Sequence, residues 1–173
     1  LPTVSIAQSH HNTAALPPQP CPRAIKAILP PDRCAVAQEM ISNWEGYQST
    51  PLLNLQGLAH AVGIQSIFYK DESDRFGLRR FKALGGAYAV QQVLQQVLSQ
   101  RPSSGSVSLT DINDGKFPNE VKNITVVTAT DGNHGRSVAW GAERFGCECM
   151  IYMHANVSQA RQEAVEAFGA TAI

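Results

Sequence analysis

Lys82 lies between an aromatic residue and a run of small residues, in the stretch FGLRRFKALGGAYAV that covers 76–90. An amine that is held partly unprotonated against a carbonyl carbon forms a Schiff base. Small residues on the next turn, above all Gly85 and Gly86, would let a flat aromatic cofactor approach the backbone. Each of these glycines otherwise costs a helix about 1 kcal/mol relative to alanine. Judged on Lys82 alone, a first-turn lysine that extends into water is the more common arrangement.

A second stretch that can do chemistry is TATDGNHGRSVAWGAERFG, residues 128–146. It follows a predicted strand, turns tightly through Asp131, Gly132 and Asn133, and enters a predicted helix. Backbone N–H groups at such a helix start bind a carboxylate or a phosphate. The Asn133 amide can donate to a phenolate oxygen, and the Asp131 carboxylate can act as a base or bind an ammonium group. For this turn alone, the alternative that Asp131 or Asn133 only caps the helix is about as common.

The elements that must position these residues alternate between strand and helix after residue 123. Strands are expected over 124–128, 147–153 and 170–173, and helices over 133–145 and 158–168. Short connections between alternating strands and helices imply a parallel sheet with flanking helices and right-handed crossovers. We therefore predict an α/β fold. We expect it to be incomplete at the C-terminus, because a new strand opens there.

The pattern before residue 123 is less regular. Residues 1 to about 31 are rich in Pro, Ser, Gln and Ala, which is typical of an irregular lead-in. Helices are expected from Asp32 onward, over 55–62 and over 81–98, with a strand over 64–70 and core positions for Trp44 and Trp140. The polar segment 99–123 is long enough that we expect an insertion, a lid or a disordered connection.

The composition argues against several classes of partner. The chain has 173 residues, with 14 basic and 14 acidic side chains and no basic stripe, so we expect no nucleic-acid partner. No apolar run is long enough to span a bilayer, so we expect no membrane partner. The four cysteines lack the C-x-x-C and His/Cys spacings of zinc sites. We expect no metal, and reduced cysteines that fit a cytoplasmic protein.

The two stretches together resemble a known family. The run KDESDRFGLRRFKALGGAYA (70–89) and the run ATDGNHGRSVAWGAERFG (129–146) are similar to pyridoxal-phosphate enzymes of fold type II, the tryptophan-synthase-β fold. Within that group both runs look like diaminopropionate ammonia-lyase, and GYQSTPLLNL (46–55) matches the entry into that fold. The resemblance covers about residues 44–173. It implies that the chain is an N-terminal fragment of such an enzyme.

The resemblance also implies a domain division. Residues 1–43 are an irregular and helical lead-in, residues 44–80 begin the large domain, and residues 81–173 form a truncated small α/β domain. The glycine-rich loop that binds the cofactor phosphate in the family is not found before residue 173, and we expect it downstream. We therefore expect this chain alone neither to retain the cofactor well nor to turn over substrate.

Site residues follow from the resemblance position by position. Lys82 matches the lysine that binds pyridoxal phosphate as a Schiff base, and Asn133 matches the asparagine that bonds to the cofactor's O3′. The loop Thr130, Asp131, Gly132, Asn133 and His134 matches the one that receives the substrate carboxylate. Asp131 matches an aspartate used in proton abstraction, where serine and threonine dehydratases carry a hydroxyl residue. A carboxylate there would attract the second ammonium group of a diamino acid.

The implied reaction is the breakdown of D- or L-2,3-diaminopropionate to pyruvate and ammonia, by a full-length protein that is a homodimer. Two alternatives stay open. One is another ammonia-lyase, dehydratase or synthase of the same fold, acting on another amino acid. The other is a non-catalytic interaction module derived from this fold. Arg75 and Asp74 either form a surface pair or order the segment before Lys82, and His134 is expected to be structural to its loop.

Overall fold

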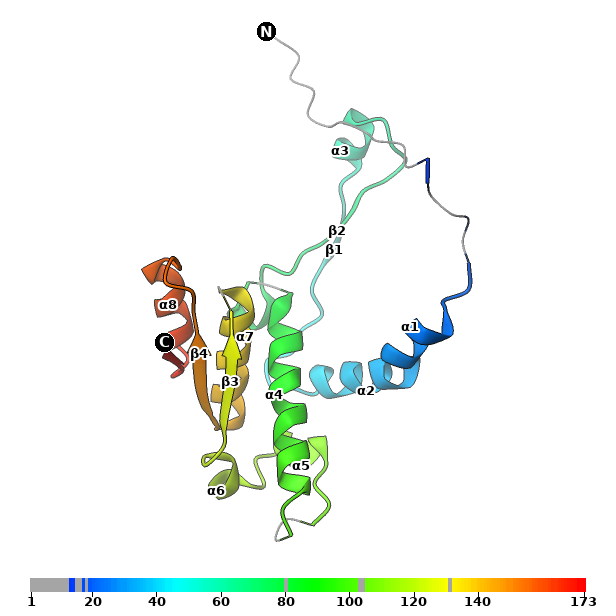
Figure 1. Ribbon diagram of the computed structural model, residues 1–173. Coiled ribbons are helices and arrows are strands. Elements are labelled where there is room, and N and C mark those ends of the chain that lie inside the picture. The colour runs from blue at the N-terminus through cyan, green and yellow to red at the C-terminus, as the bar shows by residue number, and fades with distance from the viewer. Residues whose placement is uncertain (1–12, 15–16, 18, 80, 103–104, 131) are drawn as a thin grey trace.

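The chain is built around a small parallel sheet with helices on one face. The structure, a computed structural model, describes all residues except 1–12, 15–16, 18, 80, 103–104 and 131. The strands β3 (Thr125–Ala129), β4 (Glu148–Tyr152) and β5 (Thr171–Ala172) are parallel, in the order β3-β4-β5. The helices α7 (Asn133–Phe145) and α8 (Gln159–Glu166) connect them (Figure 1). The predicted α/β fold and its parallel sheet are confirmed.

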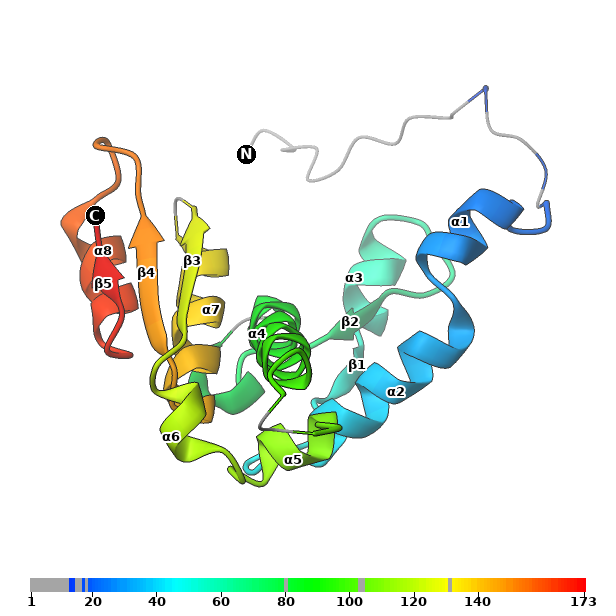
Figure 2. The same ribbon diagram turned by 60° about the horizontal axis from the view of Figure 1, so that its bottom comes forward.

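The two faces of this sheet differ. Burial alternates along β3 and β4, so that Val126, Cys149 and Ile151 are buried. Figure 2 shows α7 and α8 on one side of the strands. Residues on the other face remain exposed, such as Val127 at 59%. The period-two alternation of the strands matches a sheet covered on a single face.

The long helix α4 (Lys82–Ser99) packs along α7, and the two run in the same direction (Figure 1). Small residues make this contact close. A Cβ added at Gly141 would lie 2.6 Å from the Cα of Ala87, and one added at Gly86 would lie 2.7 Å from the Cβ of Ser137. The expectation that Gly86 clears space for a cofactor is therefore wrong, because this glycine makes room for Ser137 of α7.

Apart from residues 103–104, the segment 99–123 holds two short helices, which contradicts the expectation of a disordered connection and leaves the alternatives of an insertion or a lid open. It contains α5 (Leu109–Asn113) and α6 (Pro118–Val121), and a capping box of Ser108 and Asp111 starts α5. The apolar side chains of this segment lie in the core at 3–4% exposure: Val107, Ile112 and Val121. Their burial holds the segment against α4 although its sequence is mostly polar.

The N-terminal part consists of short elements. They are α1 (Arg23–Ile28), α2 (Pro31–Ser42), β1 (Leu52–Asn54), α3 (Gln56–Ala61), β2 (Phe68–Lys70) and the 3₁₀ helix η1 (Arg75–Gly77). The helices expected from Asp32 and over 55–62 are confirmed as α2 and α3. Three elements were missed, α1, β1 and η1. The expected strand over 64–70 is shorter, and it pairs antiparallel with β1 so that Leu52 opposes Lys70.

Trp44 is a core residue, as expected, at 2% exposure. Its ring contacts those of Phe76, Trp140 and Phe145 at centroid distances of 6.0, 5.9 and 6.0 Å. Trp140 is half-buried. Over the described part of the chain, no helix combines the length and the apolarity needed to cross a membrane.

The adjacent glycines of α4 give a matched test of this packing. Gly86→Ala should lower the free energy of unfolding by about 1–3 kcal/mol, because the new methyl group collides with Ser137. Gly85→Ala should raise it by up to about 1 kcal/mol, because an added Cβ there meets nothing within 4 Å. Urea denaturation of both variants measures the difference, and equal effects would contradict the helix contact described above.

Candidate functional site

Lys82 and Asn133 begin the two packed helices. Lys82 is the first residue of α4 and Asn133 is the first residue of α7. The buried Ser137 hydroxyl, one turn after Asn133, donates to the carbonyl oxygen of Ala83 at 2.9 Å. Because this bond joins the first turn of α4 to the second turn of α7, and both helices run in the same direction, the helix starts lie side by side. The side chains of Lys82 and Asn133 are both exposed there, and their convergence on one slot stays a prediction.

The start of α7 presents backbone N–H groups that can bind an anion. Gly132 is the N-cap residue and makes no side-chain cap hydrogen bond, while its own N–H donates to Thr130 Oγ1 at 3.5 Å. The first N–H groups of a helix have no partner inside the helix and carry a partial positive charge. Asn133 is the first residue inside α7, so it is not the N-cap of this helix. The other residue considered for capping, Asp131, lies outside the described residues.

The remaining loop residues surround this helix start. Thr130 and Gly132 are half-buried, and His134 is exposed. The backbone N–H of Thr130 donates to the carbonyl oxygen of Tyr152 at 3.0 Å, which fixes the loop to the end of β4. The loop therefore follows the carboxyl end of β3, where open α/β sheets bind their ligands.

These residues fit a flat, anionic cofactor. Above the first turn of α4, an added Cβ at Gly85 would meet nothing within 4 Å, so the backbone there is open to a planar ring. For such a cofactor, the Lys82 amine could supply a nucleophile, the Asn133 amide a polar partner and the first N–H groups of α7 an anion site. The expected role of Gly85 in making room for a cofactor is compatible with this open space and stays a prediction.

The backbone just before Lys82 is strained. Phe76 and Arg79 have φ values of 49° and 57°, in the left-handed region that side chains other than glycine rarely adopt, and Gly77 between them has a φ of 68°. Such residues persist only where the surroundings hold them, and they gather at functional sites. The Phe76 ring is held by Trp140 at a centroid distance of 4.9 Å and by Tyr47 at 6.2 Å.

A buried ion pair anchors the same segment. The Arg75 side chain is 6% exposed, and its Nε donates to Glu72 Oε2 at 2.7 Å. Its Nη1 donates to the carbonyl oxygen of Gln48 at 2.8 Å, and its Nη2 donates to Thr50 Oγ1 at 2.9 Å. Arg75 is therefore not in a surface pair with Asp74. The alternative interpretation holds, in which it orders the segment before Lys82.

The protonation of this pair follows from its geometry. The hydrogen bond from Arg75 lowers the pKa of Glu72 to about 2, and the same bond raises the pKa of Arg75. Sequence reasoning missed Glu72 and Ser137. The Glu-x-x-Arg spacing of 72–75 is a signal of an ion pair, whereas a lone serine in a helix gives no signal of its own.

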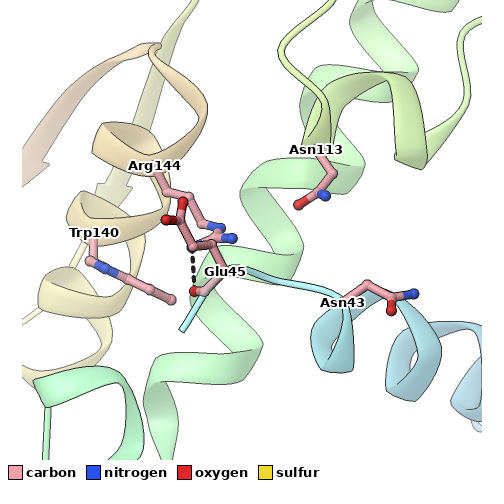
Figure 3. A pocket seen from close by; sticks show the side chains of 5 residues that line it. All are labelled: Asn43, Glu45, Asn113, Trp140 and Arg144. Atoms are coloured by element: carbon pink, nitrogen blue, oxygen red, sulfur yellow. Dashed lines mark hydrogen bonds between the residues drawn. The ribbon is translucent and has the colours of Figure 1, made fainter. Parts of the chain in front are cut away.

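Of two hollows, one lies at the end of α7 that is far from Lys82, and the other is lined by Gly86 and His134 near the two helix starts. Figure 3 shows the first, a polar pocket of about 500 Å³ lined by Asn43, Glu45, Asn113, Trp140 and Arg144. There Arg144 Nη1 donates to the backbone carbonyl of Glu45 at 3.2 Å. This pocket is near the C-terminal end of α7, the opposite end from Asn133. The second, a groove of about 370 Å³ between α4 and β3, reaches His134 and is otherwise mainly apolar.

The cysteines offer no alternative nucleophile in the sheet. Burial raises the pKa values of the Cys147 and Cys149 thiols to about 11, so both stay protonated at neutral pH. Within the described residues, no three His, Cys, Asp or Glu side chains gather as a metal site.

Known proteins resemble this chain in sequence and in fold. The profile of the family described as "Pyridoxal-phosphate dependent enzyme" matches residues 44–173. The diaminopropionate ammonia-lyase of Salmonella typhimurium is 44% identical over 124 residues, which are 72% of this chain and 30% of that protein. The enzyme of the same name from Escherichia coli K12 is 38% identical over 139 residues, which are 80% of this chain and 33% of that protein.

Comparison with solved structures gives the same result as the comparison of sequences. The apo form of Escherichia coli diaminopropionate ammonia lyase has a TM-score of 0.69 at 37% identity, over 82% of this chain and 36% of that one. A pyridoxal 5′-phosphate-dependent aspartate racemase has a TM-score of 0.55 at 25% identity, over 80% of this chain and 35% of that one. The chain spans about a third of the length of the curated relatives it matches.

The depressed pKa of Glu72 predicts an acid-sensitive fold. Its folded-state value of about 2 lies below the ordinary 4.5. The ionised carboxylate therefore stabilises the fold fully above about pH 4.5, by about 3 kcal/mol. This contribution is lost as the pH falls toward 2. Glu72→Gln should flatten the acid dependence of the unfolding free energy between pH 5 and pH 2, as measured by denaturant titration.

The control for this experiment is Glu143→Gln, at an exposed glutamate that forms no ion pair with the described residues. It should leave the acid dependence as in the unmodified protein. Glu72→Gln should also lower stability at neutral pH by about 3–5 kcal/mol, because Arg75 then stays buried without its partner charge. An unchanged acid profile in Glu72→Gln would contradict the ion pair.

Proposed function

The chain belongs to the family of pyridoxal-phosphate dependent enzymes, and on this basis we propose that it is part of an ammonia-lyase acting on 2,3-diaminopropionate. The reaction consumes the diamino acid and one water molecule and yields pyruvate and two molecules of ammonia. The observation that carries the proposal is the side-by-side start of α4 at Lys82 and α7 at Asn133. Identities of 44% and 38% to two diaminopropionate ammonia-lyases support the choice of substrate.

The proposal gives each residue of the site a task. The Lys82 amine would hold pyridoxal phosphate, and the Asn133 amide would donate to the ring oxygen. The loop Thr130–His134 would bind the substrate carboxylate through backbone N–H groups at the positive end of α7, apart from the N–H of Thr130, which already donates to Tyr152. When bound, the cofactor withdraws electrons from the carbon beside the substrate's amino group. The protein's task is then to bind, orient and move protons at that carbon.

Two residues share the proton transfer in this proposal. Lys82 Nζ would take the α-proton of one enantiomer and the Asp131 carboxylate that of the other, from opposite sides of the substrate. The Asp131 carboxylate would also attract the second ammonium group, which a hydroxyl residue does much more weakly. This charge selects a diamino acid over a hydroxy amino acid. A crystal structure of the Escherichia coli enzyme in complex with D-serine makes serine a natural competitor in the test.

The whole protein is proposed to be a cytoplasmic homodimer with two domains. Residues 44–80 would begin its large domain, and residues 81–173 would form most of its small domain. The separate two-stranded sheet of β1 and β2, apart from the sheet of β3, β4 and β5, supports this division. Light scattering of the full-length protein tests the dimer, and cell fractionation tests the cytoplasmic location.

Removal of the Lys82 amine is the first test of this function. Lys82→Ala in the full-length protein should abolish pyruvate release from 2,3-diaminopropionate, together with any absorbance above 400 nm after incubation with pyridoxal phosphate. Lys122→Ala is the matched control, because Lys122 is an exposed lysine outside the site, and it should keep both signals. Pyruvate release by Lys82→Ala at the unmodified rate would refute the role of Lys82.

The substrate choice is tested at Asp131. Asp131→Ser should lower kcat/KM for 2,3-diaminopropionate by about 100-fold, because the substrate loses the charge partner of its second ammonium group. It should lower kcat/KM for serine much less. Assays of the full-length protein with 2,3-diaminopropionate, serine and threonine measure the ratio. Equal losses on all substrates would argue for another ammonia-lyase or dehydratase of this fold.

A further inference from the structure

We propose that the buried network of Thr50, Glu72 and Arg75 is a positioning device that sets the direction of the Lys82 amine. The inference rests on the proposed function, because it assumes that Lys82 holds the cofactor. None of the three residues is placed in contact with cofactor or substrate. They act through the backbone that leads into α4.

The network joins two separate chain segments rigidly. The Arg75 guanidinium donates from Nε, Nη1 and Nη2, and it stacks over the Tyr47 ring at 5.4 Å. Thr50 is 7% exposed, and its hydroxyl also donates to Glu72 Oε1 at 2.6 Å. Lys70 Nζ donates to the Thr50 carbonyl oxygen. A planar guanidinium with several fixed partners allows little rotation.

The residues that follow Arg75 toward Lys82, from Phe76 to Arg79, have little freedom. Phe76 and Arg79 hold left-handed backbone conformations, which relax unless the surroundings fix them. Phe76 is fixed by its aromatic neighbours, and Leu78 is 4% exposed. The network is the polar part of the same anchor, since Arg75 directly precedes the first strained residue.

Lys82 is also held from its other side. Ala83 is 2% exposed, and its carbonyl oxygen accepts the Ser137 hydroxyl. The backbone at position 82 therefore lies between an anchor at Arg75 and an anchor on α7. The amine is at the end of a flexible side chain, so the protein controls its approach mainly through the direction of the Cα–Cβ bond. Loosening one anchor would let this direction vary.

The effect is expected from geometry and not from charge. Glu72 and Arg75 neutralise each other, and both are largely buried, at 17% and 6% side-chain exposure. A variant that keeps the positive charge at position 75 but loses the planar guanidinium group should therefore impair the positioning of Lys82. Arg75→Lys is this variant, because an ammonium group cannot make the same set of planar contacts.

The experiment uses the full-length protein and pyridoxal phosphate as the probe. Reduction with borohydride at increasing incubation times fixes a pyridoxyl group on reacted lysines, and peptide mass spectrometry measures it at Lys82. Arg75→Lys should slow labelling of Lys82 by about tenfold or more and change its pH dependence, with labelling of the exposed Lys122 unchanged. Thr50→Val keeps the side-chain volume and removes the hydroxyl. It should slow the labelling of Lys82 less than Arg75→Lys does.

The control is Arg144→Lys. Arg144 also stacks over aromatic rings, at 5.4 Å from Trp44 and 5.7 Å from Trp140, and its hydrogen bond goes to the carbonyl oxygen of Glu45, outside the segment before Lys82. This variant should label Lys82 at the rate of the unmodified protein. Thr50→Val covers the case in which Arg75→Lys fails to fold, as judged by circular dichroism.

Two results would overturn the inference, and they distinguish a failure of the positioning role from a failure of the proposed function. If the unmodified protein labels Lys82 selectively and the folded Arg75→Lys and Thr50→Val variants do so at the same rate and with the same pH dependence, the network has no positioning role. If the unmodified protein does not label Lys82 selectively, the proposed function fails and the positioning role fails with it.

Discussion

The close contact between α4 and α7 is the constraint on which the site depends. Glycines at positions 86 and 141 bring the two backbones together, and the Ser137 hydroxyl then reaches the Ala83 carbonyl oxygen. Because the helices run in the same direction, this register also aligns their first turns. The helix starts at Lys82 and Asn133 are brought together by packing that involves neither of their side chains. The proposed site thus depends on the shape of a helix interface.

Two adjacent glycines illustrate what the sequence can and cannot reveal. Gly85 and Gly86 look alike in the sequence, and both suggest space for a cofactor. They differ by about 100° around the helix axis, so one faces open space and the other faces Ser137. Which of the two faces the neighbouring helix depends on where α7 packs, and that position is a property of the fold.

The best-predicted parts are those whose signals are local. The helix over 133–145 was predicted with the observed bounds, because a tight turn precedes it and Gly146, with a φ of 80°, ends it. The two helices within the segment 99–123 were not predicted, because its few apolar residues become significant only when α4 offers them a surface. The ion pair of Glu72 and Arg75 has a local spacing, but its burial depends on the distant segment that contains Thr50.

Two features that are unfavourable for the local structure occur together at the start of α4. A cation stands at the N-terminal end of α4, where the helix dipole disfavours it, and the backbone just before it is strained at Phe76 and Arg79. Local sequence and fold usually agree, and disagreement is typical of functional sites. Three kinds of contact stabilise these unfavourable features here: a buried ion pair, a cluster of aromatic rings and an interhelical hydrogen bond. These stabilising contacts around Lys82 are difficult to explain for a lysine that only extends into solvent. They are expected for a lysine whose amine must react.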